Sequence, residues 1–396
     1  MRRTWPRSSG SASTRSGPPS RRPTSPPSRS RCARGSTPRT RTTGSGRSRT
    51  SDSASPTARR TSPTCRSEPR TLNLYGTPRS PRGTMDRVEL GNSGIKVSRI
   101  GLGMWQAGGK NWGKDVNDRD CVAAMVRAQE RGVNLIDTAE VYGEGHSEEV
   151  VGRAVRQIGR DNVVLATKVA GYHMRERDVE RACRASLRRL GVKEIDLYQV
   201  HWPDPWDQVP FAEGFRALER LWKRGLVRAI GVSNFAVRDL EDARARLRAA
   251  DIVANQVRYN LLQTEIEAEV LPYCRQERIT VLAWSPLAQG VLADTYRVGR
   301  VPRDSIRKQN DLFSPKNLRE AGKLLRALRK VAKAHRRNVA QVALNALSKD
   351  PIVVPIPGAK RPSQAEENAA AVSFDLTPAE RRAIEAAAQS TRVETF

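Results

Sequence analysis

From residue 100 onward, short apolar runs alternate with longer amphipathic stretches. The amphipathic stretches are typical of helices, and several of them end in glycine, the usual residue after a helix C-terminus. The apolar runs are apolar almost throughout instead of alternating with polar residues, which is typical of parallel strands that helices cover. Eight such runs can be counted: IGLGM, VNLIDTA, VVLATK, IDLYQVH, VRAIGVSN, VANQVRYN, TVLAWSPL and IVVPIPGA.

This repeat predicts an α/β fold, a (β/α)8 TIM barrel. Eight strand–helix units in about 310 residues match the usual size of such a barrel. The alternative is an open, doubly wound sheet, which would carry a G-x-G-x-x-G motif between its first strand and first helix. In GLGMWQAGG the third glycine of that motif would fall at Gln106, so the sequence favours the barrel. Before the barrel, VELGNSGIKVS predicts a β-hairpin with Asn and Gly in its turn.

The net charge of +28 divides the 396 residues into two unlike parts. Residues 1–84 carry 19 Arg, no Lys, and only Asp52 and Glu68 as acids, which gives 19 − 2 = +17 and leaves +11 for residues 85–396. The first part is rich in Arg, Ser, Pro and Thr, and it is predicted to be disordered because it has too few apolar residues to bury a core.

Three interpretations of residues 1–84 remain open. The segment could bind nucleic acid or anionic lipid through its arginines, or it could be an organelle transit peptide. The interpretation that we favour is translation upstream of the true start, since Met85 directly precedes the globular pattern. Under this interpretation residues 85–396 are the whole folded domain, and residues 1–84 are no part of the native protein.

The remaining composition predicts a cytoplasmic protein without a metal site. No apolar stretch is long enough to span a bilayer. The five cysteines are scattered and form no C-x-x-C, which is typical of reduced thiols. His146 and Glu149 do not form a zinc motif, because H-E-x-x-H is absent. A basic stretch near residues 326–337 predicts a solvated helix face, so no nucleic-acid partner is expected for the barrel.

Four reactive side chains stand at the ends of three successive strand-like runs: Asp137, Tyr142, Lys168 and His201. In a barrel these positions converge on one mouth. Buried lysine is costly unless it is paired, so Asp137 is expected to contact Lys168. A lysine beside the tyrosine would make the phenol a stronger acid, which suits proton delivery to a carbonyl oxygen. The alternative is a structural ion pair beside an ordinary tyrosine and a hydrogen-bonded histidine.

The motifs around these residues resemble the aldo-keto reductases. IDTAEVYGEGHSEEVVGRA, ATK, GVSNF, NQVRYN, LAWSPLAQGVL and PIPGAKRPSQAEEN occur in family order from residue 86 to about residue 390. The resemblance implies a barrel that binds NADP(H) without a Rossmann domain. It implies that Tyr142 is the general acid, that Lys168 paired with Asp137 lowers the pKa of Tyr142, and that His201 orients the carbonyl.

The resemblance also assigns a cofactor site. Ser233, Asn234 and Gln256 end two strands, and their hydroxyl and amide groups match the carboxamide of nicotinamide. Trp284 corresponds to the aromatic residue that stacks on the nicotinamide ring. A loop along the pyrophosphate is expected from Ser285, Pro286, Leu287, Gln289 and Gly290.

The last motif bears on the choice between NADP and NAD. Pro357, Gly358, Ala359 and Lys360 end the eighth strand, and a helix is expected from Ser363. Its N-terminus and the neighbouring cations would attract phosphate, and Lys360 is placed for the 2′-phosphate of NADP. The resemblance assigns positions around the adenosine to Gln364, Glu367 and Asn368.

Two loops are expected to shape the substrate pocket, residues 202–212 and 288–316. Trp202 and Trp206 in the first loop, with Trp105 after the first strand, predict an aromatic-walled pocket for a small carbonyl substrate. The sequence thus predicts NADPH-dependent reduction of an aldehyde or ketone. Two alternatives are a cofactor-sensing regulatory subunit of the kind that associates with channels, and a nucleic-acid binder that works through residues 1–84.

Overall fold

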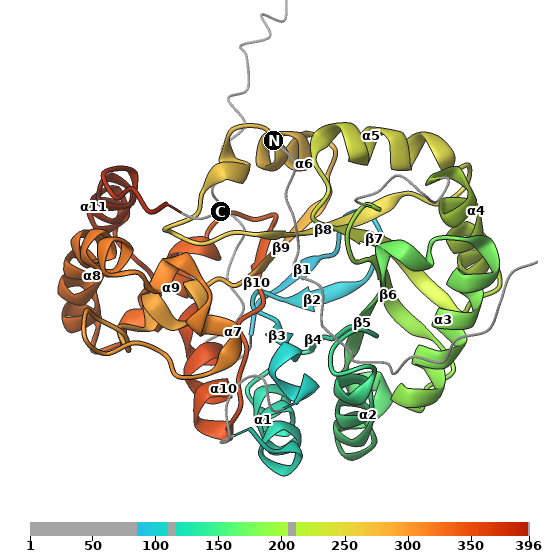
Figure 1. Ribbon diagram of the computed structural model, residues 1–396, viewed down its shortest axis with the longest axis horizontal. Coiled ribbons are helices and arrows are strands. Elements are labelled where there is room, and N and C mark those ends of the chain that lie inside the picture. Colours follow the sequence, from blue (N-terminus) through green and yellow to red (C-terminus); the bar gives the residue numbers. More distant parts are fainter. Residues whose placement is uncertain (1–84, 110–115, 205–210, 395–396) are drawn as a thin grey trace, which may run out of the picture. The chain divides into compact units, whose positions relative to one another are not determined.

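Eight parallel strands form the centre of the protein, and helices surround them (Figure 1). The computed structural model describes residues 85–109, 116–204 and 211–394. Residues 1–84, which the sequence predicts to be disordered, lie outside the described part. The strands are β3 Leu102–Gly103, β4 Leu135–Asp137, β5 Val164–Val169, β6 Ile195–Val200, β7 Val227–Ser233, β8 Ile252–Arg258, β9 Thr280–Trp284 and β10 Val353–Pro355.

The sheet closes into a barrel. Every neighbouring pair from β3 to β10 is parallel and consecutive in the chain. Between the two end strands, the amide of Gly101 donates to the carbonyl of Pro355 at 2.8 Å, and that of Gly103 donates to Pro357 at 3.1 Å. A parallel bridge also joins Gly103 to Gly358. The predicted (β/α)8 architecture is therefore confirmed.

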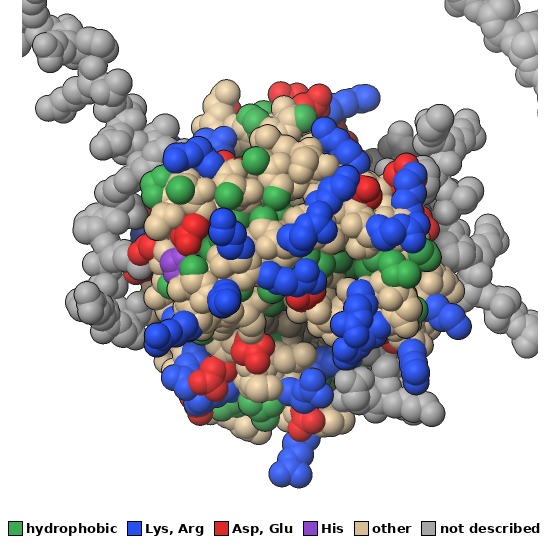
Figure 2. All heavy atoms as spheres, turned by 90° about the vertical axis from the view of Figure 1, so that its left-hand side faces the viewer, with side chains coloured by type: hydrophobic (Ala, Val, Ile, Leu, Met, Phe, Trp, Pro, Cys, Tyr) green, Lys and Arg blue, Asp and Glu red, His purple; other side chains and the backbone are tan. Residues whose placement is uncertain are grey.

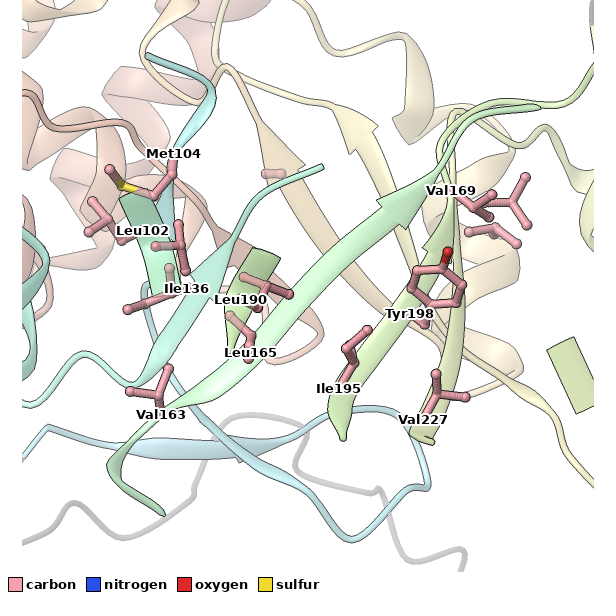
Figure 3. Packing of buried hydrophobic residues seen from close by; sticks show 14 of the residues in the cluster. Leu102, Met104, Ile136, Val163, Leu165, Val169, Leu190, Ile195, Tyr198 and Val227 are labelled. Carbon is pink, nitrogen blue, oxygen red and sulfur yellow. The ribbon is translucent and has the colours of Figure 1, made fainter. Parts of the chain in front are cut away.

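Alternation along each strand separates two apolar cores. Side chains such as Ile136, Leu165 and Tyr198 pack outward against the helices (Figure 3). Their neighbours Leu135 and Leu197 belong to a second cluster inside the barrel. Most strand residues are apolar because both sides of the sheet are buried, which explains why the sequence shows nearly continuous apolar runs.

The predicted hairpin covers the end of the barrel at which the strands begin. Strands β1 Arg87–Glu89 and β2 Lys96–Ser98 pair antiparallel. Leu90, Ile95 and Val97 join the interior cluster, and the amide of Gly91 donates to Thr280 Oγ1 at 2.7 Å. The hairpin closes this end, so the opposite end, where the strands finish, is the open mouth.

The helices follow the strands as expected, but three of the described helices were not predicted from the sequence. The amphipathic stretches of the sequence and the helix expected from Ser363 correspond to eight of the described helices. The helices at Ser305–Lys308, Val339–Leu347 and Pro378–Gln389 were not predicted. The bounds are α1 Asp118–Glu130, α2 His146–Ile158, α3 Glu176–Leu190, α4 Phe211–Lys223, α5 Val237–Arg246, α6 Val270–Gln276, α7 Ser305–Lys308, α8 Pro315–His335, α9 Val339–Leu347, α10 Pro362–Ala369 and α11 Pro378–Gln389.

Helix α8 presents the basic face that the sequence predicts. Arg326, Lys330 and Lys333 are exposed, whereas Leu324, Leu325 and Leu328 are buried. The face of the molecule that is on the left in Figure 1 carries many lysine and arginine side chains (Figure 2). Among the described helices, none combines the length and the apolar character that crossing a membrane requires.

Candidate active site

The four predicted reactive residues come together at the open mouth. Asp137 is the last residue of β4, Lys168 lies near the end of β5, and His201 directly follows β6. Tyr142 lies in the turn between β4 and α2, and its amide donates to the carbonyl of Ala139 at 3.1 Å. Because these strands are parallel neighbours, their C-terminal ends bring the four side chains to one place.

Lys168 and Asp137 form a buried ion pair. Lys168 Nζ lies 2.6 Å from Asp137 Oδ1 and donates to the carbonyl of Thr138 at 2.8 Å. Burial alone would lower the pKa of Lys168, but Asp137 and Tyr142 more than offset this, so its pKa lies above its ordinary value. The lysine therefore stays charged, because the neighbouring carboxylate stabilises the ammonium.

The Tyr142 hydroxyl is the third group of this cluster, 3.2 Å from Lys168 Nζ. Burial raises the pKa of Tyr142 above its ordinary value, Asp137 raises it further, and Lys168 opposes both. Lys168 lowers the pKa of Tyr142 as expected, but burial outweighs the cation, so the net pKa lies above the ordinary value. The phenol stays protonated at neutral pH, which is the state that a proton donor needs.

His201 faces the same tyrosine and is neutral. The two rings meet edge to face, with centroids 5.4 Å apart. Burial, together with the charge of Lys168, holds the pKa of His201 well below 6.5. Its Nδ1 is buried without a hydrogen-bond partner among the residues that the structure describes. A neutral imidazole at this position can donate or accept a hydrogen bond.

Two glutamines extend the cluster, and sequence reasoning missed one of them. Leu135 and Leu197 lie inside the barrel, so Asp137 and Gln199, two positions further along their strands, face the interior as well. Gln199 Nε2 donates to Asp137 Oδ2 at 3.1 Å, and Gln256 Nε2 donates to the same oxygen at 2.9 Å. The spacing of two from Leu197 is the signal that could have identified Gln199.

Ser233, Asn234 and Trp284 form a second polar group beside Gln256. The Ser233 hydroxyl donates to the carbonyl of Gln256 at 2.8 Å. Asn234 Nδ2 donates to the carbonyl of His201 at 3.0 Å, and Trp284 Nε1 donates to Asn234 Oδ1 at 3.1 Å. These bonds fix the partly exposed indole ring next to the strand ends.

The segment after Trp284 has an unusual backbone. Ser285, Ala288 and Gln289 have φ values of 54°, 48° and 53°, and Gly290 has 106°. Left-handed conformations are uncommon for residues other than glycine, and strained backbone gathers at functional sites. The side-chain oxygen Oε1 of Gln289 is buried without a partner among the described residues. All five predicted residues belong to this segment: Ser285, Pro286, Leu287, Gln289 and Gly290.

The last predicted motif lies between β10 and α10, next to the closure of the barrel. The amide of Lys360 donates to Gln364 Oε1 at 2.9 Å, and Asn368 Nδ2 donates to the carbonyl of Gly358 at 3.2 Å. A Cβ atom on Gly358 would meet the amide of the Gln106 side chain at 2.0 Å, so a larger residue at this position would displace that side chain. The carbonyl of Pro357 accepts from the amide of Gly103, as described above. The Glu367 carboxylate accepts from Asn338 Nδ2 at 3.2 Å.

Aromatic side chains border the mouth on two sides. The centroid of Trp105 lies 6.1 Å from that of Tyr142, and Trp202 lies 4.4 Å from His201. Tyr172, which the sequence analysis did not name, lies 6.1 Å from Trp202. Trp105 and Tyr172 are 37% and 46% exposed, which is high for aromatic residues. Trp206, the third predicted pocket residue, lies outside the described residues.

Comparison with known proteins adds to this geometry. A family model described as "Aldo/keto reductase family" matches residues 99–389. The chain is 34% identical over 324 residues to the aldo-keto reductase YhdN of Bacillus subtilis, covering 78% of this chain and 95% of that protein. It is also 32% identical over 317 residues to the NADH-specific methylglyoxal reductase of Escherichia coli, covering 75% of this chain and 96% of that protein.

Solved structures show the same relationship. The aldo/keto reductase of Klebsiella pneumoniae in complex with NADP and acetate is 32% identical to this chain and superposes with a TM-score of 0.61. The match covers 76% of this chain and 95% of that one. The identity exceeds what a shared fold alone would give.

Proposed function

The chain belongs to the aldo/keto reductase family of oxidoreductases, and we propose that it reduces an aldehyde or ketone to the alcohol with NADPH, with Tyr142 as the general acid. The observation that carries the proposal is the buried contact between the Tyr142 hydroxyl and Lys168 Nζ at 3.2 Å, with Asp137 at 2.6 Å behind it. A protonated phenol next to a fixed cation is suited to giving up its proton to a carbonyl oxygen.

The residues at the mouth fit a nicotinamide dinucleotide. Trp284 offers a partly exposed aromatic face, and Asn234 and Ser233 offer amide and hydroxyl groups beside it. The buried oxygen of Gln289 has no partner among the described residues, so an acceptor is left for a ligand donor. NADPH, when bound, would supply the hydride.

The protein's own part in the reaction is to position the carbonyl and deliver the proton. Tyr142 would give the proton of its O–H bond to the carbonyl oxygen while the carbonyl carbon accepts a hydride. The Lys168 ammonium stabilises the phenolate that remains. Neutral His201 can donate a hydrogen bond to the same oxygen and so stabilise the charge that develops there.

The preference for NADPH over NADH rests on the motif at the start of α10. Lys360 and Arg361 stand next to the helix N-terminus, where phosphate is attracted. Because a relative is described as NADH-specific, turnover should be measured with both nucleotides. A preference for NADH would contradict the assignment of Lys360 to the 2′-phosphate.

The experiment is a panel of aldehydes and ketones assayed by the loss of NADPH absorbance, with Tyr142→Phe. Losing the general acid should lower kcat by a factor of about 10² to 10⁴. The matched control is Tyr198→Phe, because the Tyr198 hydroxyl is fully buried and has no hydrogen-bond partner within the described residues. This control should turn over normally.

Two results would contradict the proposal. Normal turnover by Tyr142→Phe would exclude the tyrosine as the acid. Binding of NADPH without turnover of any carbonyl by the unmodified protein would instead favour the regulatory, cofactor-sensing alternative.

A further inference from the structure

The Asp137 carboxylate is held through both of its oxygens. Oδ1 lies 2.6 Å from Lys168 Nζ. Oδ2 accepts from Gln199 Nε2 at 3.1 Å and from Gln256 Nε2 at 2.9 Å. The three partners come from three different strands, so Asp137 has little freedom to rotate as long as all of them are present.

The glutamine on β6 is an unusual residue for its position. Interior layers of such barrels are dominated by bulky branched residues, and the residue two positions earlier on the same strand is Leu197. Gln199 is completely buried, and burying an amide is unfavourable unless it is hydrogen-bonded. An apolar residue would fill this position without the free-energy cost of burying an amide. We therefore expect the Gln199 amide to be present because of its hydrogen bond to Asp137.

We propose that Gln199 is a positioning residue of the active site, whose amide holds Asp137 Oδ2 so that Oδ1 stays directed at Lys168 and Lys168 stays beside Tyr142. The proposal rests on the proposed reductase function. Since Gln199 has no exposed surface, it contacts no substrate and acts only through Asp137. Its backbone is also the register partner of Lys168 on the neighbouring strand.

Gln256 has other contacts besides the one to Asp137. Its Nε2 is shared between Asp137 Oδ2 and Gln199 Oε1, the latter at 3.3 Å. Its strand end also belongs to the polar group of Ser233 and Asn234 that we assign to the nicotinamide amide. Gln199 is thus the donor to Asp137 that has no second duty at the cofactor site.

Loss of the Gln199 amide has a predictable effect on Tyr142. The titratable groups that face the tyrosine among the described residues are Lys168, Asp137 and His201. Without the amide, the charge of Asp137 is less neutralised and Lys168 is less firmly placed. Both changes disfavour the phenolate, so the pKa of Tyr142 should rise further.

The test compares Gln199→Met and Gln199→Leu with the unmodified protein. Both substitutions remove the amide. Leucine is also the residue two positions earlier on the same strand, at Leu197, so at least one of the two variants is expected to fold. We expect kcat to fall about tenfold, the order of effect that a small displacement of a catalytic group produces. The alkaline limb of the kcat/KM profile should move upward by about half a pH unit, and the KM for NADPH should change less than about twofold.

The matched control is Asn345→Leu. Asn345 is also a fully buried amide, but it donates to the carbonyls of Ala371 and Phe374 at 2.8 Å, far along the chain from the site. The Asn345→Leu variant should lose stability without any shift in the pH profile of kcat/KM. If the Gln199 variants fold and behave like this control in both kcat and profile, Gln199 is only structural and the proposal is overturned.

A second measurement separates this proposal from the proposed function. Titration of tyrosinate absorbance, with Tyr142→Phe subtracted, reports the ionisation of Tyr142 without any turnover. We expect this transition to move to higher pH in Gln199→Met. If the Tyr142 transition does not move, the positioning role is overturned, even if the protein proves to reduce no carbonyl. If the transition moves but the protein reduces no carbonyl, only the reductase function is overturned.

Discussion

Removal of the Lys168 ammonium would leave the Asp137 carboxylate buried without its cation. Lys168→Met is expected to lower the free energy of unfolding by about 3 to 5 kcal/mol, since breaking one half of a buried pair leaves an uncompensated charge. The double variant Asp137→Asn, Lys168→Met should regain much of this loss, because both charges are gone. Denaturant unfolding of the two single variants and the double variant measures the coupling. If the stability losses of the two single variants simply add in the double variant, Asp137 and Lys168 are not tightly coupled.

At the same scale, the sequence predicts which polar residues gather but not how their burial changes them. Asp137, Tyr142, Lys168 and His201 could be identified because each ends, or closely follows, an apolar run. The net direction of the Tyr142 pKa shift could not be predicted, because the sequence shows the neighbouring lysine but not how deeply the phenol is buried. Gln199 was overlooked because an almost wholly apolar run conceals which of its sides faces the barrel.

At the scale of helices and strands, two glycines in helix interiors make a matched pair. A Cβ atom on Gly152 in α2 would lie 2.7 Å from the carbonyl oxygen of Leu190 and 2.8 Å from that of Arg189, at the end of α3. A Cβ atom on Gly322 in α8 would meet nothing within 4 Å. Gly152 therefore lets two helices approach closely, whereas Gly322 only weakens its own helix.

The same substitution should consequently have opposite effects at the two positions. Gly322→Ala should raise the free energy of unfolding by about 0.5 to 1 kcal/mol, the difference in helix propensity. Gly152→Ala gains the same propensity but should lose about 1 to 3 kcal/mol through backbone overlap, so the net change is destabilising. Thermal or denaturant unfolding measures both. Equal stabilisation at both positions would mean that α2 and α3 can separate without penalty.

One of the helices that the sequence analysis missed, α9, was overlooked for a physical reason. Helix α9 is short and buried over most of its surface, so its pattern lacks the polar face by which the other helices were identified. Its start is nevertheless marked, because Asn338 Oδ1 accepts from the amide of Gln341 at 2.8 Å and Gln341 Oε1 accepts from the amide of Asn338 at 3.1 Å. Thr377 and Glu380 mark α11 in the same way.

At the scale of the whole molecule, the closure of the barrel depends on contacts that no local pattern contains. The amides of Gly101 and Gly103 bond residues more than 250 positions later in the chain, at Pro355 and Pro357. The number of strands predicted the closed barrel, and the absence of a dinucleotide motif agreed with it. The register of the closing pair could come only from the structure.

The largest question at this scale concerns residues 1–84. The described fold begins at Met85, which packs against the outer core, and the first strand begins at Arg87. A chain that starts at Met85 keeps every contact described above, so we expect it to unfold at the same temperature and to turn over carbonyls at the same rate as the full chain.

Charge makes the two forms distinguishable in another assay. The full chain carries +28, of which the first 84 residues contribute the +17 counted above. Binding to nucleic acid through this segment would be strongly salt-dependent and would disappear in the chain that starts at Met85. If that shorter chain failed to fold or lost turnover, the first 84 residues would have to belong to the working protein, since no described contact accounts for such a loss.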